Sequence, residues 1–275
     1  MLFEFDKRIS LLKLREKCPL IQCITNEVAM NFCANVLNAV GASPVMSFAP
    51  DEAAEFVDNA DAVTTNIGTL TLEKYAGMRL VMERAKVLGK PVVFDPVAHF
   101  ATSFRTNATA HLLTLSPRII KGNASEIIAL TSKTTAHGVD SQDDGANSFY
   151  AAIAAAQKTK AVIAMSGKSD FITDGKRHVL IAGGNSLMSK VSACGCALTC
   201  VTGAFVALAP DKPFDAAVKA FSTFSAAGTL AGRTAKGPGT FVPLFIDALA
   251  TIDDKTVEAS ASVTPWQEQE RNRIN

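Results

Sequence analysis

Short runs of apolar residues alternate with longer segments of helical periodicity along most of the chain. The short runs predict strands at Leu20–Ile24, Ser43–Phe48, Ala62–Ile67, Pro91–Asp95, Arg118–Lys121 and Ala161–Ser166. The longer segments predict helices over Val28–Val40, Asp51–Asn59, Leu72–Leu88, Asn107–Leu115, Ser125–Leu130 and Ala146–Thr159. Strands that alternate with helices are typical of an α/β fold, so we expect a mainly parallel central sheet with helices on both faces.

The pattern changes after the last of these strands. Phe171–Thr173 and His178–Ile181 flank the turn residues Asp174–Gly175, which predicts an antiparallel hairpin at the edge of the sheet. The pattern then becomes helical, with helices predicted over Cys196–Leu208, Phe214–Thr234 and Phe241–Ile252. The tail beyond Asp253 is polar, and we expect it to fray.

The first residues, Met1–Cys18, alternate apolar and charged side chains, which predicts an amphipathic helix and not a secretory signal. Apolar stretches stay below the length of about 18 residues that a membrane span needs, so we expect a cytoplasmic protein with no membrane contact. Neither an internal repeat nor a linker interrupts the pattern. We therefore expect residues 1–275 to form one domain.

Composition and charge argue against nucleic-acid binding, a disulfide-stabilised fold and a metal site built on histidines. The formal net charge is +1, and no basic run is interleaved with aromatic residues, so we expect no nucleic-acid partner. The six cysteines form no CxxC pair, and a chain of this length needs no disulfides, so most are expected to be buried. Cys194 and Cys196 alone are a weak signal for a metal or redox site. The histidines lack metal-ligand spacing.

The most informative segment is Lys190–Leu198. We expect a strand-like stretch that ends in a tight turn and leads directly into an apolar helix. Backbone N–H groups converge at such a helix start, and the positive end of the helix dipole favours an anion such as phosphate there. The same helix start favours the thiolate form of a cysteine. The segment therefore predicts an anion-binding turn beside a reactive thiol, a layout that suits phosphoryl transfer.

Polar side chains follow several of the predicted strands, and ligands of parallel α/β sheets bind beyond the carboxyl ends of the strands. We place the carboxylates of Asp95 and Glu126 near Mg²⁺, because one or two carboxylates together with nucleotide phosphates suffice to hold this ion. Asn26 could add a carbonyl oxygen or orient a water molecule. Lys121 ends a strand at the same edge, where its ammonium could contact nucleotide phosphates.

Each of these residues also has a purely structural explanation. Asp95–Pro96 can simply end a strand, and Asn123 with Glu126 can form a capping box at the start of the next helix. Lys121 can be a solvated lysine at a strand end. The sequence has neither a G-x-x-x-x-G-K-[ST] nor a G-x-G-x-x-G motif, so a kinase built on it has another design.

Several motifs taken together resemble the hydroxyethylthiazole kinase family. In chain order they are Pro19–Asn26, Gly41–Met46, Asn66–Leu70, Asp95–Val97, Gly122–Ile127, Val191–Cys196 and Gly237–Pro243. Their order and spacing match the family from about residue 10 to residue 252, and the combination of the first two with Gly122–Ile127 is highly specific. The resemblance implies a ribokinase-like fold, a homotrimer with active sites between subunits, and ATP with Mg²⁺.

The resemblance also implies the reaction, which is phosphorylation of the primary alcohol of 4-methyl-5-(2-hydroxyethyl)thiazole in thiamine synthesis. Carried over residue by residue, it implies substrate contacts by Met46, Asn66, Gly68 and Ala193, ATP contacts by Asn26, Lys121 and Ser166, and Mg²⁺ near Asp95 and Glu126. It places Cys196 beside the substrate hydroxyl. We expect this thiol to assist the reaction without being indispensable.

The chain departs from the family pattern at the anion-binding turn and at one cation. Ala193 and Cys194 stand where the family has glycine and then threonine or serine, and Lys121 stands where it has arginine. A methyl group narrows the approach of backbone to ligand, and lysine lacks the bidentate fork of arginine. Two alternatives therefore stay open: a kinase for another small heteroaromatic alcohol, and a nucleotide- or thiazole-binding protein with little catalysis. Assays with a panel of alcohols distinguish the first alternative from a thiazole kinase. Binding of nucleotide or thiazole without ATP-dependent product formation would identify the second.

Overall fold

The computed structural model describes residues 3–131 and 144–267 of the chain. Its centre is a nine-stranded sheet in the order β2-β1-β3-β4-β5-β6-β7-β8-β9. The strands are β1 (Leu20–Ile24), β2 (Ser43–Val45), β3 (Ala62–Asn66), β4 (Val92–Asp95), β5 (Ile119–Asn123), β6 (Val162–Ser166), β7 (Asp170–Thr173), β8 (His178–Ala182) and β9 (Ser262–Pro265). Strands β1 to β6 are parallel to their neighbours, and β7, β8 and β9 extend the sheet with antiparallel pairing.

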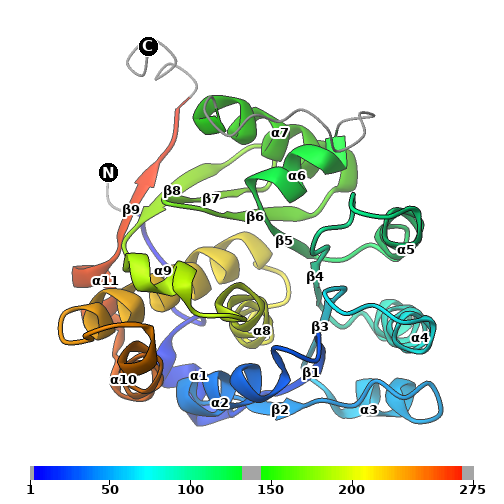
Figure 1. Cartoon of the computed structure of the whole chain (residues 1–275), viewed down its shortest axis with the longest axis horizontal. Helices are drawn as coiled ribbons and strands as arrows, with labels where there is room; N and C mark the ends of the chain where they lie inside the picture. The colour runs from blue at the N-terminus through cyan, green and yellow to red at the C-terminus, as the bar shows by residue number, and fades with distance from the viewer. Residues whose placement is uncertain (1–2, 132–143, 268–275) are drawn as a thin grey trace.

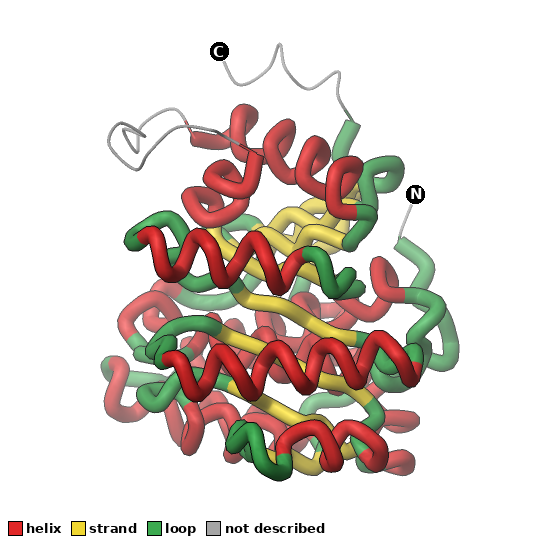
Figure 2. The backbone as a smooth tube through the Cα atoms, turned by 90° about the vertical axis from the view of Figure 1, so that its right-hand side faces the viewer, coloured by secondary structure: helices red, strands yellow, loops and turns green. Residues whose placement is uncertain are grey.

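Helices cover both faces of the sheet (Figure 1). One face carries α1 (Leu11–Lys17), α2 (Met30–Val40), α8 (Cys194–Val206), α9 (Pro213–Gly232), α10 (Pro238–Thr251) and α11 (Asp254–Ser260). The other face, which Figure 2 presents to the viewer, carries α3 (Ala53–Asn59), α4 (Leu72–Leu88), α5 (Ser103–Leu113), α6 (Ala124–Thr131) and α7 (Asp144–Thr159). The predicted α/β architecture, with a mainly parallel sheet between two helical layers, is confirmed.

The predicted parallel strands and the hairpin are all present, most of them with ends shifted by one or two residues. The second predicted strand is too long, because β2 lies at the edge of the sheet and pairs with β1 through three residues only, so it ends at Val45. The helix predicted from Asn107 begins at Ser103 instead, since the Thr102 side chain caps it by accepting a hydrogen bond from the backbone N–H of Arg105.

The prediction for the N-terminus is wrong over its first half. The helix begins only at Leu11, after the N-cap Ser10. Phe3 and Phe5 lie before it and pack against the core formed by the α8–α9 layer, and the Lys219 ammonium lies 4.5 Å from the centre of the Phe5 ring. The alternating apolar residues therefore pack on a neighbouring helix without forming one themselves.

The prediction of a frayed tail beyond Asp253 is also wrong for residues 254–267, whereas its last part, residues 268–275, lies outside the described residues. The Asp253 side chain caps α11, and β9 then pairs with β8. Trp266 follows and packs edge-on against Phe171, with a centroid distance of 5.5 Å. Strand β9, and not the hairpin, therefore forms this edge of the sheet.

The sheet brings the site residues together, because parallel strands place their carboxyl ends at one edge. Every residue of β3 and β4 is buried, as expected for parallel strands covered by helices on both faces, although β3 carries the polar side chains of Thr64, Thr65 and Asn66. Helix α8 packs across β1, β3 and β4. None of the helices in residues 3–131 and 144–267 is long and apolar enough to cross a membrane.

Candidate active site

Asp95, the last residue of β4, is fully buried at the carboxyl edge of the sheet. Its Oδ2 accepts hydrogen bonds from Asn66 Nδ2 at 2.8 Å and from Thr199 Oγ1 at 2.6 Å. Lys121 Nζ lies 3.7 Å from the same oxygen. Asp95 Oδ1 has no hydrogen-bond partner among the described residues. Burial raises the pKa of Asp95, although the Lys121 ammonium acts against that rise.

A chain of amide side chains connects Asp95 to α8. Asn66 Oδ1 accepts hydrogen bonds from Asn26 Nδ2 and from the Gly68 backbone N–H, both at 2.9 Å. Asn26 Nδ2 also donates to Cys196 Sγ at 3.1 Å. A Cβ atom on Gly68 would lie 2.7 Å from the Asn26 side chain, so only glycine fits this position. Thr199, on the next turn of α8, donates back to Asp95, so these hydrogen bonds form a chain from Cys196 through Asn26, Asn66 and Asp95 to Thr199, and the backbone of α8 closes it into a ring.

Lys121 lies beneath the first turn of α8. A Cβ atom on Gly195 would lie 3.0 Å from Lys121 Nζ, and only 5% of the lysine is exposed. Burial alone would lower the pKa of Lys121, but the carboxylates of Asp95 and Glu126 outweigh it and raise that pKa overall. The lysine is therefore a buried cation at neutral pH and not the solvated strand-end lysine of the structural alternative.

Glu126 forms the capping box that the sequence offered as the alternative to a metal role. The Asn123 backbone N–H donates to Glu126 Oε2 at 2.8 Å, and the Glu126 N–H donates to Asn123 Oδ1 at 2.9 Å. Glu126 Oε1 also accepts a hydrogen bond from the Ala98 N–H at 3.0 Å. Glu126 thereby connects the turn after β4 to the start of α6. Its role at a metal stays a prediction.

Ser166 is the last residue of β6, directly before the turn to β7, and lies opposite Asn123 in the sheet. Asp170 closes this turn, because its Oδ1 accepts a hydrogen bond from the Gly167 N–H at 3.0 Å. Its Oδ2 accepts one from Ser225 Oγ at 3.4 Å. Burial raises the pKa of Asp170 to about 7. Asp170 was not predicted from the sequence, because a single acidic residue near a predicted turn forms no motif that would identify it.

The anion-binding turn (residues 193–196) leads into a helix as predicted, but the segment that precedes the turn differs from the prediction. Ser186–Lys190 form a 3₁₀ helix, so the prediction of a strand-like segment before the turn is wrong. Ala193 is the N-cap of α8 and has no side-chain oxygen to offer to the first N–H groups of the helix. These donors are available to a ligand. Ala193 also has a φ of 68°, which places a non-glycine residue in the left-handed region.

The expectation of a reactive thiolate at this turn is wrong. Burial raises the pKa of Cys194 to about 12. Burial also raises the pKa of Cys196, and the negative charge of Asp95 adds to the effect. Both cysteines are therefore thiols at neutral pH, because burial outweighs the Lys121 ammonium, which acts to lower the pKa of each.

Met46 was predicted from the sequence as a substrate contact, whereas Thr199 was not predicted at all. Met46 directly follows β2 and packs, partly buried, against the α8–α9 core. Thr199 was missed, since it lies in an apolar helix with no motif around it, although it makes the shortest hydrogen bond to Asp95.

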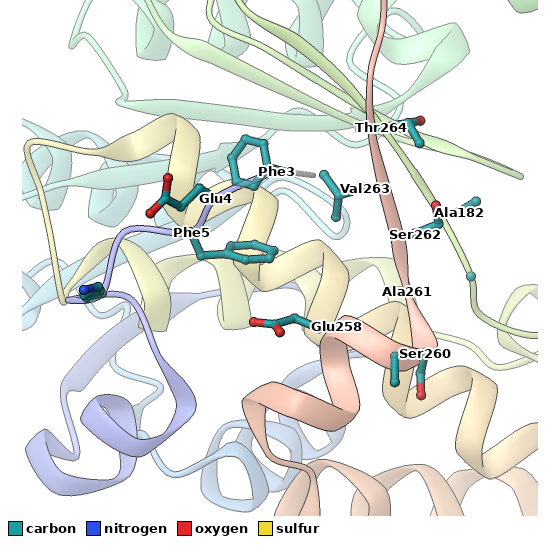
Figure 3. Close-up of a pocket in the computed structure, with 13 residues that line it drawn as sticks. Phe3, Glu4, Phe5, Ala182, Glu258, Ser260, Ala261, Ser262, Val263 and Thr264 are labelled. Carbon is teal, nitrogen blue, oxygen red and sulfur yellow. The ribbon is translucent and has the colours of Figure 1, made fainter. Parts of the chain in front are cut away.

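The pocket shown in Figure 3 lies elsewhere. It is a cavity of about 1090 Å³ between the N-terminal segment, α11 and β9. Phe3, Phe5, Glu258 and Val263 are among the residues that line it. None of the strand-end residues described above does, so this cavity is separate from the candidate active site.

The residues at the strand ends suit a divalent cation held together with a ligand. Within the described ranges no three His, Cys, Asp or Glu side chains form a group that could hold a metal by themselves. Asp95 Oδ1 is nevertheless a buried carboxylate oxygen without a partner, beside a turn of free N–H donors. A Mg²⁺ ion that keeps several waters and binds mainly through phosphates needs only one or two such oxygens.

The fold and this site define a ribokinase-like kinase of a small molecule. The solved structure of a pyridoxal kinase from Staphylococcus aureus shares the fold with a TM-score of 0.60 at 14% identity, over 90% of this chain and 99% of that one. A solved structure of a hydroxyethylthiazole kinase from Pyrococcus horikoshii OT3 is similar with a TM-score of 0.86 and 36% identity, over 94% of this chain and 97% of that one.

Sequence comparison narrows the class to one family. The model of the hydroxyethylthiazole kinase family matches residues 11–255. A hydroxyethylthiazole kinase from Rhizobium johnstonii is 52% identical over 252 residues, which cover 91% of this chain and 94% of that protein. One from Cereibacter sphaeroides is 45% identical over 249 residues, covering 90% and 94%. The chain belongs to the hydroxyethylthiazole kinase family.

Proposed function

We propose that this protein transfers the terminal phosphoryl group of ATP to the hydroxyl group of 4-methyl-5-(2-hydroxyethyl)thiazole, a step in thiamine synthesis. One observation carries the proposal. The carboxylate of Asp95 has one oxygen without a partner, a buried lysine within 3.7 Å of the other, and the uncapped start of α8 beside it. Carboxylate, cation and helix start are the groups that phosphoryl transfer requires in one place.

Positioning and charge neutralisation supply most of the catalysis in phosphoryl transfer. Lys121 would contact the phosphates of ATP, and Asn26 would hold Cys196 and the first turn of α8 in place. The N–H groups of residues 193–196 would stabilise negative charge on the group in transfer. Asp95 would hold Mg²⁺, with Glu126 nearby, and the ion when bound would supply positive charge to the phosphates. Ser166, at the end of β6, would contact ATP.

The substrate hydroxyl needs only a weak base, because the transition state of phosphoryl transfer is loose. Cys196 is a thiol at neutral pH, so its role would be to orient the hydroxyl by hydrogen bonding and not to remove the proton. The hydroxyl proton would pass instead to an oxygen of the phosphoryl group in transfer. We expect slow turnover for this reason. Met46, Asn66, Gly68 and Ala193 would lie on the substrate side.

We also propose that the protein is a cytoplasmic homotrimer. The support is membership of the hydroxyethylthiazole kinase family, because the resemblance to this family implies active sites between subunits. Light scattering after size-exclusion chromatography should give three times the 29.0 kDa mass of the chain. A monomer or dimer mass would contradict the trimer and leave the reaction untouched.

The test is release of ADP from Mg·ATP in the presence of hydroxyethylthiazole, with mass spectrometry of the product. We expect a phosphorylated thiazole, and a fall in kcat of about 10²-fold or more for Asp95→Asn, which keeps the shape of the side chain and removes its charge. Asp58→Asn is the matched control, because Asp58 pairs with Arg84 on an exposed surface. A product formed with another heteroaromatic alcohol but not with the thiazole would show that the protein is a kinase with a different substrate. Binding without any product would contradict the kinase.

A further inference from the structure

Two turns at the carboxyl edge carry the residues of the proposed site. The turn after β3 contains Ile67 and Gly68, and the Gly68 N–H donates to Asn66 Oδ1. The turn after β4 contains Val97, whose N–H donates to the Asp95 carbonyl oxygen at 2.9 Å. The Ile67 N–H donates to the same oxygen at 3.3 Å. The distance between these turns therefore determines how Asn66 and Asp95 meet.

One side chain from α5 joins both turns. Arg105 Nη1 donates to the Ile67 carbonyl oxygen at 2.7 Å and to the Val97 carbonyl oxygen at 2.8 Å. Its Nη2 donates to the Gly68 carbonyl oxygen. The planar guanidinium can reach three acceptors in a fixed geometry, which the single ammonium of lysine cannot reproduce.

The first turn of α5 holds Arg105 in this position. Thr102 Oγ1 accepts a hydrogen bond from the Arg105 N–H at 3.2 Å. Thr106 Oγ1, on the following residue, donates to the carbonyl oxygen of His99 at 2.9 Å. The backbone of Arg105 is thus tied to the end of the same turn whose beginning its side chain contacts.

Arg105, in α5, differs from Arg79 and Arg84, which lie in the neighbouring helix α4. Arg84 pairs with Asp58, and Arg79 pairs with Glu83, both on exposed surfaces. Arg105 has three carbonyl acceptors and, within the described residues, no carboxylate within ion-pair distance. A surface ion pair does not explain its place, whereas the alignment of two site-bearing turns does.

We propose that Arg105 is a positioning residue, which holds the turns after β3 and β4 at the spacing that brings Asn66 and Asp95 together for phosphoryl transfer. The inference rests on the proposed function for its catalytic consequence. A displacement of about 1 Å in a catalytic group can cost about 10²-fold in rate. Loss of the guanidinium would therefore lower kcat more than it changes the KM for ATP.

The experiment compares Arg105→Gln and Arg105→Lys with wild type, and uses Arg84→Gln as the matched control. We expect kcat to fall about 10²-fold in Arg105→Gln, with the lysine variant between it and wild type, and the control unchanged. Hydrogen–deuterium exchange supplies a readout independent of turnover. The N–H groups of Ile67, Gly68 and Val97 should exchange faster in Arg105→Gln, while those of the strand interiors stay as in wild type.

Each outcome has one meaning. Unchanged exchange at the two turns overturns the proposal, whatever the activity. Faster exchange throughout the chain, with a melting temperature far below that of Arg84→Gln, also overturns it, because the residue then acts on the whole fold. An inactive wild-type protein would contradict the proposed function alone, and the exchange data would still decide whether Arg105 orders the two turns.

Discussion

Ala193 offers the clearest test of the physical reasoning, because it is a non-glycine residue with a φ of 68° and a ψ of 0° at the start of α8. The left-handed conformation costs an L-residue about 1–2 kcal/mol relative to the right-handed one, and glycine escapes most of this cost. Two effects oppose the gain in Ala193→Gly. The unfolded chain gains freedom worth about 0.4–1 kcal/mol, and the partly buried methyl loses its packing on the core.

We therefore expect Ala193→Gly to raise the free energy of unfolding by about 0.5 kcal/mol. The matched control is Ala110→Gly, at an exposed position inside α5 with ordinary helical geometry. That change should lower the free energy of unfolding by about 1 kcal/mol. The two variants thus differ by about 1.5 kcal/mol, which corresponds to about 3–6 °C in Tm for a domain of this size.

Thermal denaturation followed by circular dichroism measures the difference, with KM for hydroxyethylthiazole determined on the same samples. The KM should fall in Ala193→Gly, since the methyl group no longer limits the approach of a ligand to the backbone. If Ala193→Gly loses as much stability as Ala110→Gly, the strain at position 193 does not exist in solution and the reasoning fails.

Three more predictions concern the ionisable groups. Thr199→Val should lower the free energy of unfolding by about 1–2 kcal/mol in urea denaturation, since Asp95 loses its shortest hydrogen bond; an unchanged midpoint would contradict it. The pKa of Asp170 is raised from 3.8 to about 7, so its contribution to stability is fully present below about pH 4 and is lost as the pH rises through 7. Asp170→Asn should therefore gain stability over wild type as the pH rises from 4 to 8, and parallel profiles would refute this. Iodoacetamide at pH 7 should modify the exposed Cys18 well before Cys196, whose thiol stays protonated. If mass spectrometry of the modified peptides shows that Cys196 reacts faster than Cys18, Cys196 is a thiolate and the prediction is wrong.

Local pattern predicted the fold where burial is uniform along an element. Every residue of β4 is buried between two helical layers, its sequence begins with the apolar run Val92–Phe94, and its predicted limits are correct to within one residue. Pattern failed where pairing is made by the backbone. Strand β9 has exposed or half-buried side chains and joins the sheet through its ladder with β8, so nothing in its residues distinguished it from a loose tail.

The candidate site could be predicted as far as topology determines it. The rule that parallel strands end at one edge placed Asn26, Asn66, Asp95 and Lys121 together, and the hydrogen bonds between the first three and the ion pair of the last confirm this. Side-chain chemistry inside the site could not be predicted. The helix start at Cys196 favours a thiolate only if the thiol is solvated, and its burial beside a carboxylate reverses the direction of the pKa.

A chain of hydrogen bonds, closed into a ring by the backbone of α8, organises the candidate site. Cys196 and Thr199 lie on one face of α8, and each contacts a different member of the chain Asn26, Asn66, Asp95. The start of α8 is therefore tied at two points to the ends of β1 and β4, while short, stiff side chains make every connection. These contacts hold the start of α8, with its N–H donors, at the same edge of the sheet as the unpartnered oxygen of Asp95. In an enzyme that accelerates its reaction mainly by positioning, this polar ring takes the place that a strong base has in other transferases.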